Sequence, residues 1–424
     1  MTTPLDEAND ALLSERLAYG GIAKSPDTPA QFGKFYQLFG PWLWHVGRRL
    51  QTQPEWPETE KPRIAFLMDN ATGIAHGANL FKLLQCLRDY PQDIEPYVFT
   101  KEPADEAFLE AIGDVPHFCF RSDNEVKCWL LLRTLAERNN ITSVVFVSVA
   151  PGLVFAKAIE VAPSVIWWSQ KWHTLHCPGV GLLTTTHPFR PLQILADKQW
   201  HCARQSLPRL YNPYHRDIAA DMRKDLAYNT VFGWFGREEK LFDKYFVDSI
   251  CQILKAVPDS CFLWTSRTPH DFGAYLDNAG LADRHKCIGW VDTSLWTQVV
   301  DIGLDSFPFG MGHTAYQMWE AGKPVIGVAN ENPGALNTMF QLIEEGPADL
   351  KDEASKLITV KPYTETIVDF IDLAVALSKD INMQQQMGEE GRFFTDTYMR
   401  DDKLFADTFS SALLEIISEQ KNNE

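Results

Sequence analysis

A glycine-rich turn between a predicted strand and a predicted helix holds the densest group of residues able to do chemistry. The turn, residues 309–312, contains Gly310 and Gly312; the strand before it ends near Asp305 and the helix after it begins near His313. Glycines let backbone N–H groups approach a ligand, and the start of a helix offers unpaired donors and a partial positive charge. Such a turn is suited to bind an anion, in particular a diphosphate.

Side chains on the first turns of this helix add hydrogen-bonding groups. His313 and Thr314 supply donors at the same end as the glycines. Gln317 and Glu320 share a helical face with His313, because they follow at spacings of four and three residues. Either could accept hydrogen bonds from ribose hydroxyls. The alternative is a turn that only joins strand to helix, with His313 as a simple helix cap.

A second junction of strand, loop and helix, TVFGWFGREEKLFDKY at 230–245, carries Arg237 and Lys240. An ammonium group at this place could face the phosphates and stabilise the negative charge that develops on a departing nucleoside diphosphate. The alternative for Lys240 is a solvated surface lysine, and for Arg237 this alternative is stronger.

A third junction contains Gly289, Trp290 and Val291, after a short predicted strand and before a helix. Backbone groups here could hydrogen-bond a nucleotide base, and Trp290 offers a surface on which the base could stack. An aromatic side chain that anchors a loop is the competing interpretation.

Elements that would position these residues alternate between strand and helix in two separate stretches, which is typical of a parallel doubly wound sheet. Ligands of such sheets bind beyond the carboxyl ends of the strands. The sequence therefore predicts an α/β chain whose two doubly wound domains face each other across a cleft. We expect a helical segment at 1–60, a first Rossmann-like domain at 61–210, a second Rossmann-like domain at 229–385, and a C-terminal helix with a polar tail at 386–424.

Composition limits the classes of partner. The 424 residues include 39 Lys and Arg against 56 Asp and Glu, a net charge of −17, which disfavours nucleic acid as a partner. The acidic N-terminus lacks the apolar core of a signal peptide, and no apolar run approaches the ~20 residues that span a bilayer. The eight cysteines include no Cys-x-x-Cys pair, so we interpret them as reduced core residues of a cytoplasmic protein.

A family resemblance sharpens these expectations. FPFG, eleven residues and then Gly-Lys-Pro, ending at Pro324, is similar to the donor-site motif of bacterial cytoplasmic N-glycosyltransferases that modify adhesins. GHT at 312–314 resembles the eukaryotic O-GlcNAc transferase of the same family. The resemblance implies the GT-B fold and inverting, metal-independent transfer with no further cofactor, from a nucleotide sugar that we expect to be UDP-linked. It implies a role for Lys240, in EKL at 239–241, in stabilising the diphosphate leaving group, and it places 229–385 on the nucleotide-sugar side and 61–210 on the acceptor side. The relatives' larger helical domains are at most reduced to residues 1–60, so the resemblance does not identify the acceptor, which we expect to be a protein or a glycan.

The same resemblance, weaker over 63–190, implies two histidines on the acceptor side. His76 lies in GIAHGANLF, where the family places catalytic or acceptor-side histidines, and His187 ends a segment similar to a cleft segment of the bacterial enzymes. Two positions depart from the family pattern. Gln317 stands where an aspartate usually holds the ribose, and His313 stands where the bacterial enzymes have Asn.

Other functions stay open. Retaining GT-B enzymes commonly carry two glutamates eight residues apart on this helix; Glu320 fits the second, but Gly312 occupies the first position. A transferase for surface glycans or lipid-linked sugars is an alternative, since WLWHVGRR at 42–49 pairs Trp with two arginines and allows peripheral membrane contact. A catalytically silent GT-B partner or chaperone protein is another. An NAD-dependent oxidoreductase is disfavoured, because no Gly-x-Gly-x-x-Gly follows the first predicted strand.

Overall fold

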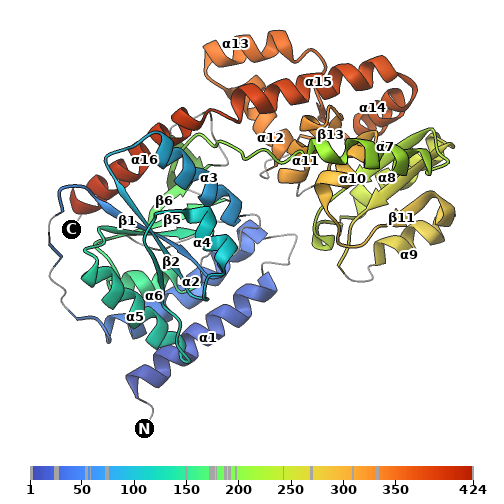
Figure 1. Cartoon of the computed structure of the whole chain (residues 1–424). Coiled ribbons are helices and arrows are strands. Elements are labelled where there is room, and N and C mark those ends of the chain that lie inside the picture. Colours follow the sequence, from blue (N-terminus) through green and yellow to red (C-terminus); the bar gives the residue numbers. More distant parts are fainter. Residues whose placement is uncertain are drawn as a thin grey trace. The chain divides into compact units, whose positions relative to one another are not determined.

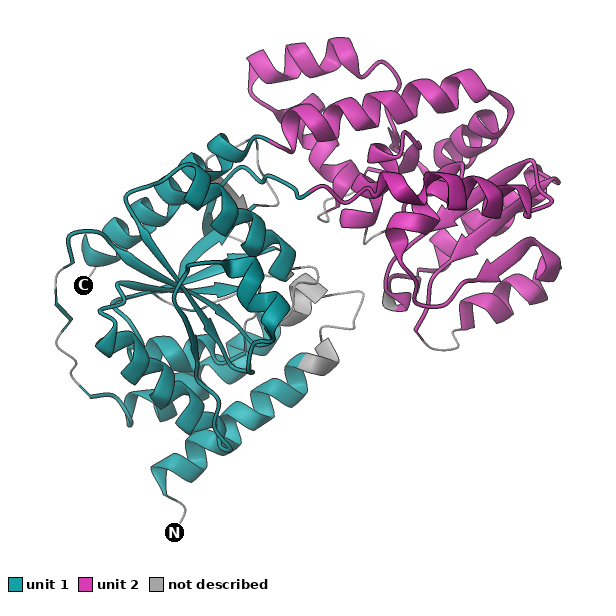
Figure 2. Ribbon diagram, viewed as in Figure 1, with its two compact units in different colours: residues 1–208, 401–424 teal, residues 209–400 magenta. Residues whose placement is uncertain are grey.

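The chain forms two compact α/β units in the computed structural model (Figure 1 and Figure 2). Unit 1 comprises residues 1–208 and 401–424, and unit 2 comprises residues 209–400. The structure describes residues 3–22, 28–52, 56–57, 59–71, 76–148, 151–170, 177, 179–185, 189, 192–195, 198–241, 243–267, 271–307, 310–329 and 334–422.

Unit 1 is built on an eight-stranded sheet in the order β3-β2-β1-β4-β5-β6-β8-β7, in which all pairs are parallel except β7 with β8. The strands are β1 (Arg63–Met68), β2 (Glu95–Thr100), β3 (His117–Cys119), β4 (Ser143–Val147), β5 (Ser164–Ser169), β6 (Gly181–Thr184), β7 (Leu192–Leu195) and β8 (Lys198–Cys202). The helices are α1 (Pro4–Ile22), α2 (Thr28–Arg48), α3 (His76–Asp89), α4 (Glu106–Ile112), α5 (Glu125–Arg138), α6 (Leu153–Ala158) and α16 (Asp402–Asn422).

Helices cover both faces of this sheet, and the strand sequences show why. Along β1, Ala65 and Leu67 belong to one hydrophobic core, while Ile64 and Phe66 belong to the other. Successive side chains of a strand point to opposite faces, so a strand between two helical layers must be apolar throughout. The first core includes residues of α1, α2, α5 and α6, and the second includes residues of α3, α4 and α16.

Helix α1 lies against groups at the carboxyl ends of this sheet. Arg16 pairs with Asp69, just beyond β1, at 3.3 Å, and the Glu15 carboxylate accepts a hydrogen bond from the Gly152 N–H at the start of α6 at 2.8 Å. Asn9 accepts from the first amide of α5 at 3.1 Å. Because β1 and β4 are the neighbours at which the strand order reverses, side chains of α1 occupy part of the edge where a doubly wound sheet commonly binds ligands.

Burial of Glu15 makes the stability of unit 1 depend on pH. Its side chain is fully buried, and this burial raises the pKa of Glu15 to about 8. A carboxyl group with a raised pKa stabilises the fold below the unfolded pKa, and this contribution is lost as the pH rises to the folded value. Between about pH 5 and 8 we expect the free energy of unfolding to fall by up to about 1.4 kcal/mol per pH unit. Calorimetry of Glu15→Gln should show a much flatter dependence; the matched variant Asp10→Asn, exposed on the same helix, should keep the wild-type slope.

Unit 2 has a six-stranded, fully parallel sheet in the order β11-β10-β9-β12-β13-β14. Numbered within the unit, this order is 3-2-1-4-5-6, that of a dinucleotide-binding doubly wound sheet, and its order reverses between β9 and β12. The strands are β9 (Thr230–Trp234), β10 (Ser260–Trp264), β11 (His285–Cys287), β12 (Ile302–Leu304), β13 (Val325–Val328) and β14 (Tyr363–Thr364). The α-helices are α7 (Arg216–Lys224), α8 (Lys244–Ala256), α9 (Asp271–Asn278), α10 (Thr293–Val299), α11 (His313–Glu320), α12 (Ala335–Phe340), α13 (Ala348–Leu357), α14 (Ile367–Lys379) and α15 (Ile381–Tyr398).

The structure divides the C-terminal region differently from the prediction. The sequence analysis places one helix and tail at 386–424, whereas α15 belongs to unit 2 and α16 packs on unit 1 against α3, β6 and β8. The interpretation of the cysteines as core residues is wrong for Cys119 and Cys287, which are exposed. Their strands, β3 and β11, each end a sheet, so only one side of each strand is covered by a neighbour.

The segment considered for membrane contact belongs to α2. Leu43 and Val46 are buried in the core of unit 1, and Arg48 and Arg49 pair with Glu160 and Glu7. Its apolar side chains therefore largely face protein. Across the described residues, every helix is either too short or too polar to cross a bilayer.

Candidate functional site

Loops that follow β9 and β12 meet where the strand order of unit 2 reverses. The Nζ of Lys240 donates a hydrogen bond to the Gly310 carbonyl, and the Thr314 hydroxyl donates to the Phe235 carbonyl at 2.8 Å. β9 and β12 are adjacent, with Gly233 in register with Gly303, so their carboxyl ends deliver both loops to one place. Lys240, predicted as a catalytic cation, thus lies beside the predicted anion-binding turn.

Glycine in β12 brings helix α11 close to the sheet. A Cβ on Gly303 would lie 2.7 Å from the Met318 sulfur of α11, so the Met318 side chain packs directly on the strand at this glycine. Since α11 follows directly on the glycine-rich turn, this contact lies close to the predicted anion-binding turn.

Thr265, just beyond β10, holds the loop after β9 from the other side. Its hydroxyl donates to the Gly236 carbonyl at 2.8 Å and accepts from the Gly236 N–H at 2.9 Å. Together with Thr314 it fixes the backbone of residues 235–236 ahead of Lys240. The sequence analysis missed Thr265, although a hydroxyl residue directly after a buried strand was a signal of this role.

Asp305 organises the glycine-rich turn and was also missed as a site residue. Its buried carboxylate accepts a hydrogen bond from the Met311 N–H, and a Cβ on Gly310 would lie 2.8 Å from its Oδ2. Glycine at 310 therefore allows the backbone to close over the carboxylate. Burial raises the pKa of Asp305 to about 7, against the opposing effects of the Met311 N–H and the Lys240 ammonium. An acidic residue directly after a buried strand was the sequence signal.

Helix α11 begins at His313 with Gly312 as its N-cap. No side chain caps the helix, and a Cβ at Gly312 would meet no atom within 4 Å, so the backbone here is open to an approaching group. Unpaired amides and the helix dipole make such an end attractive to anions. Burial lowers the pKa of His313, so its imidazole is neutral at pH 7 and can donate one hydrogen bond and accept another.

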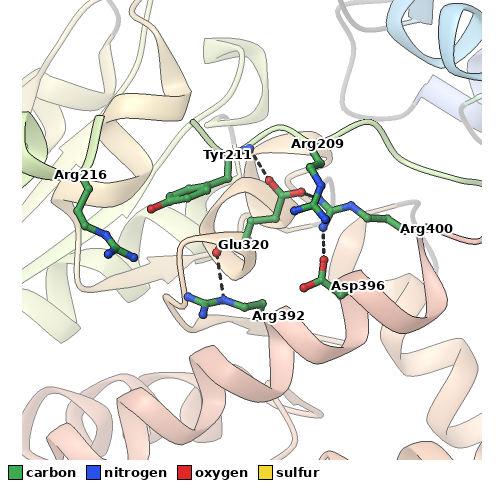
Figure 3. A pocket seen from close by; sticks show the side chains of 7 residues that line it. All are labelled: Arg209, Tyr211, Arg216, Glu320, Arg392, Asp396 and Arg400. Atoms are coloured by element: carbon green, nitrogen blue, oxygen red, sulfur yellow. Dashed lines mark hydrogen bonds and ion pairs between the residues drawn. The ribbon is translucent and has the colours of Figure 1, made fainter. Parts of the chain in front are cut away.

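Gln317 and Glu320, predicted to bind ribose, both contact the segment after the unit boundary. Gln317 Nε2 lies 3.5 Å from the Leu210 carbonyl. The Glu320 carboxylate accepts hydrogen bonds from the Leu210 N–H, at 3.0 Å, and the Tyr211 N–H, and it pairs with Arg400 (Figure 3). Glu320 ends α11, opposite His313, and its carboxylate is fully engaged there.

The predicted base-binding residues lie after β11, at the edge of the sheet. Gly289 has a positive φ of 76°, and Trp290 is 55% exposed, with the Arg267 guanidinium 4.2 Å from its ring centroid. Val291 continues this loop toward α10. Arg237 is the residue before the short 3₁₀ turn that contains Lys240, and it is partly buried. The Arg267 guanidinium thus covers one face of the Trp290 ring. The sequence analysis did not name Arg267 as a residue of the base-binding region.

The two predicted acceptor-side histidines belong to unit 1. His76 is the first residue of α3, and its side chain is outside the part of the chain that the structure describes. His187 lies outside the described residues altogether. Among the described residues, no three His, Cys, Asp or Glu side chains gather closely enough to hold a metal ion.

Comparisons with known proteins give matches to structures only. No protein-family model and no curated protein matches the sequence. A mutant of the Thermobaculum terrenum O-GlcNAc transferase is similar with a TM-score of 0.65 and 18% identity, over 99% of this chain and 82% of that one. A glycosyltransferase from Rickettsia africae ESF-5 is similar with a TM-score of 0.56 and 14% identity, over 86% and 100%. Anabaena HepE, solved in complex with UDP, is similar with a TM-score of 0.58 and 13% identity, over 83% and 100%.

These similarities concern the fold. The chain has the GT-B architecture, with two Rossmann-like doubly wound units, and the predicted fold class is confirmed. The cleft expected between the two domains stays a prediction.

Proposed function

We propose that this protein is a glycosyltransferase that uses a nucleotide sugar, UDP-linked, as its donor. The observation that carries this proposal is the meeting of Lys240 with the glycine-rich turn ahead of α11, at the point of unit 2 where the strand order reverses. Doubly wound sheets bind phosphates of nucleotides at this point. Fold similarity to glycosyltransferases and to a UDP complex supports the same conclusion.

The chemistry follows from charge. When the bond between the sugar and the phosphate breaks, negative charge develops on the departing nucleoside diphosphate. In this proposal the Lys240 ammonium, beside the glycine-rich turn, and the backbone amides at the start of α11 stabilise that charge. Transfer to a protein or glycan acceptor, with inversion and without a metal ion, belongs to this proposal. Trp290 would stack on the base, Thr314 and Gln317 would bond the donor, and Arg237 would add positive charge.

Acceptor-side roles are proposed for His76 and His187, with His76 as the candidate proton acceptor. Glu320 is left out of the donor site, because its carboxylate is engaged by Arg400 and two backbone amides at the far end of α11.

A thermal-shift panel of nucleotides and UDP-sugars, followed by a hydrolysis and transfer assay, tests the proposal. A ligand that binds only the folded state raises the melting temperature by mass action. We expect UDP and at least one UDP-sugar to raise it and that sugar to be turned over. No shift with any nucleotide would reject the donor site.

A catalytically silent GT-B protein is the second candidate, because neutral Gln317 stands where the resembling family usually has an aspartate. Binding of UDP-sugars in calorimetry without hydrolysis or transfer would favour it. Turnover by the wild-type chain would exclude it.

Asp305 should make diphosphate binding depend on pH. Its pKa is about 7, so its side chain is protonated and neutral below that pH. Above that pH the ionised carboxylate repels a nearby diphosphate. We expect UDP affinity to fall from pH 6 to pH 8 more steeply in the wild type than in Asp305→Asn, which keeps an acceptor for the Met311 N–H. Comparing the two chains by calorimetry cancels the titration of UDP itself. Parallel profiles would contradict this role of Asp305.

A further inference from the structure

A polar pocket in unit 2 lies at the opposite end of α11 from the candidate donor site. Its volume is about 190 Å³ (Figure 3). Four arginines, two carboxylates and one tyrosine line it, so its lining carries two more positive than negative charges. This is notable in a chain whose net charge is −17. His313 and Glu320 are the two ends of α11, about 10 Å apart at 1.5 Å per residue.

The two carboxylates of the lining both pair with the same arginine. Arg400 pairs with both Glu320 and Asp396 (Figure 3). Glu320 also receives hydrogen bonds from two backbone amides. These contacts hold both carboxylates in place, and the lining as a whole keeps an excess of two positive charges.

The other three arginines keep donor groups available. Arg209 and Arg216 are exposed, and Arg392 donates only its Nε, at 3.1 Å, to the Glu320 carbonyl. In the described part of the chain, none of the three forms an ion pair with a carboxylate. Figure 3 shows Arg216 and Arg392 directed toward the space beside the Tyr211 ring. Guanidinium groups present paired N–H donors that match the oxygens of a phosphate group.

We propose that this pocket binds a phosphate group, either as inorganic phosphate or as the monoester of a small metabolite. The volume supports a ligand of this size, because pockets for larger ligands usually measure about 300–1,000 Å³. Arg216, Arg392 and Arg209 supply the charge, and the Tyr211 hydroxyl supplies a further donor.

The position of the pocket gives binding a structural consequence. Arg209 and Arg400 are the first and last residues of unit 2, where the chain enters and leaves it. Arg216 begins α7, while Arg392 belongs to α15. A phosphate held between these arginines ties the entering segment to the leaving one.

Titration calorimetry of the full chain with inorganic phosphate, at constant ionic strength, tests the proposal. We expect saturable one-to-one binding, and an affinity at least about ten-fold lower in the double variant Arg216→Gln/Arg392→Gln. Arg138→Gln, which removes an exposed arginine of unit 1, should bind as the wild type does. The same pair of titrations in a Lys240→Ala background, which lacks the cation of the candidate donor site, should show the same loss of affinity on the double substitution.

Equal phosphate affinity in the wild type and the double variant would overturn the proposal, and so would equal affinity with and without the double substitution in the Lys240→Ala background. Absence of saturable binding at about 20 mM phosphate and low salt would overturn it too, since weak screening favours an exposed charged site. Glycerol 3-phosphate, titrated in parallel, separates the sources. Tighter binding of the monoester identifies an organic phosphate, and equal or weaker binding identifies inorganic phosphate; either result supports the pocket. Neither depends on glycosyl transfer.

Discussion

Replacement of Lys240 by alanine should lower turnover of the nucleotide sugar about 10²–10³-fold, the usual effect of removing one donor that stabilises developing charge. The ammonium lies at the Gly310 carbonyl, beside the open start of α11. It also favours the ionised form of Asp305. We therefore expect a large decrease in the turnover rate of the variant and little change in its melting temperature. Steady-state kinetics with a thermal melt of the same sample measure both.

Lys244→Ala is the matched control for this experiment. Lys244 is the exposed first residue of α8, four positions further along, so its removal changes the net charge equally without touching the glycine-rich turn. Its kinetics should equal those of the wild type. If Lys240→Ala kept near wild-type rates, the lysine would have no role in charge stabilisation; a comparable loss in both variants would point to net charge alone.

Glu320→Ala should destabilise unit 2 by about 3–5 kcal/mol, because it leaves a buried guanidinium without its carboxylate. The Glu320 side chain is only 4% exposed, and that of Arg400 is 11% exposed. The amides of Leu210 and Tyr211 lose their acceptor at the same time. Hydrogen exchange measured by mass spectrometry should show faster exchange in α11, α15 and the segment after residue 208, and unchanged exchange in unit 1.

Asp221→Ala provides the comparison for an exposed pair. Asp221 contacts Lys224 on α7 at 2.9 Å, with both side chains about three-quarters exposed, so solvent screens the pair and its loss should change the stability little. Similar exchange in the Glu320 and Asp221 variants would show that Glu320 does not hold the two chain segments together.

The doubly wound architecture could be predicted because each buried strand carries its own signal. The runs IAFLM at 64–68 and VIWW at 165–168 are apolar throughout, as the central parts of strands between two helical layers must be. Strand β6 has only four residues, and its extended conformation depends on its pairing with β5 and β8. The sequence alone therefore does not predict this strand. The break between α15 and α16 was missed for a similar reason. Neither Gly nor Pro marks residues 399–401, and the chain turns where Arg400 meets Glu320.

The candidate site was predictable where it depends on strand ends. Lys240 and the glycine-rich turn follow β9 and β12, and adjacency of these strands brings them together. Side-chain partners made by distant segments were not predictable. Glu320 has the spacing on α11 that is expected of a residue that binds ribose. Its carboxylate instead forms an ion pair with Arg400, which lies 80 positions away in the sequence.

Helix α16 determines the order in which the two units can fold during translation. Phe405, Phe409 and Leu413 of this helix are fully buried in the second core of unit 1, and the members of that core outside α16 all precede residue 209. During translation that core lacks one wall until residues 402–422 have left the ribosome. Unit 2, a single continuous stretch, has all its residues earlier and can fold first, while an open apolar surface on unit 1 invites chaperones or premature association. A released chain that ends before residue 402 would thus contain every residue of unit 2 but only an unfinished unit 1.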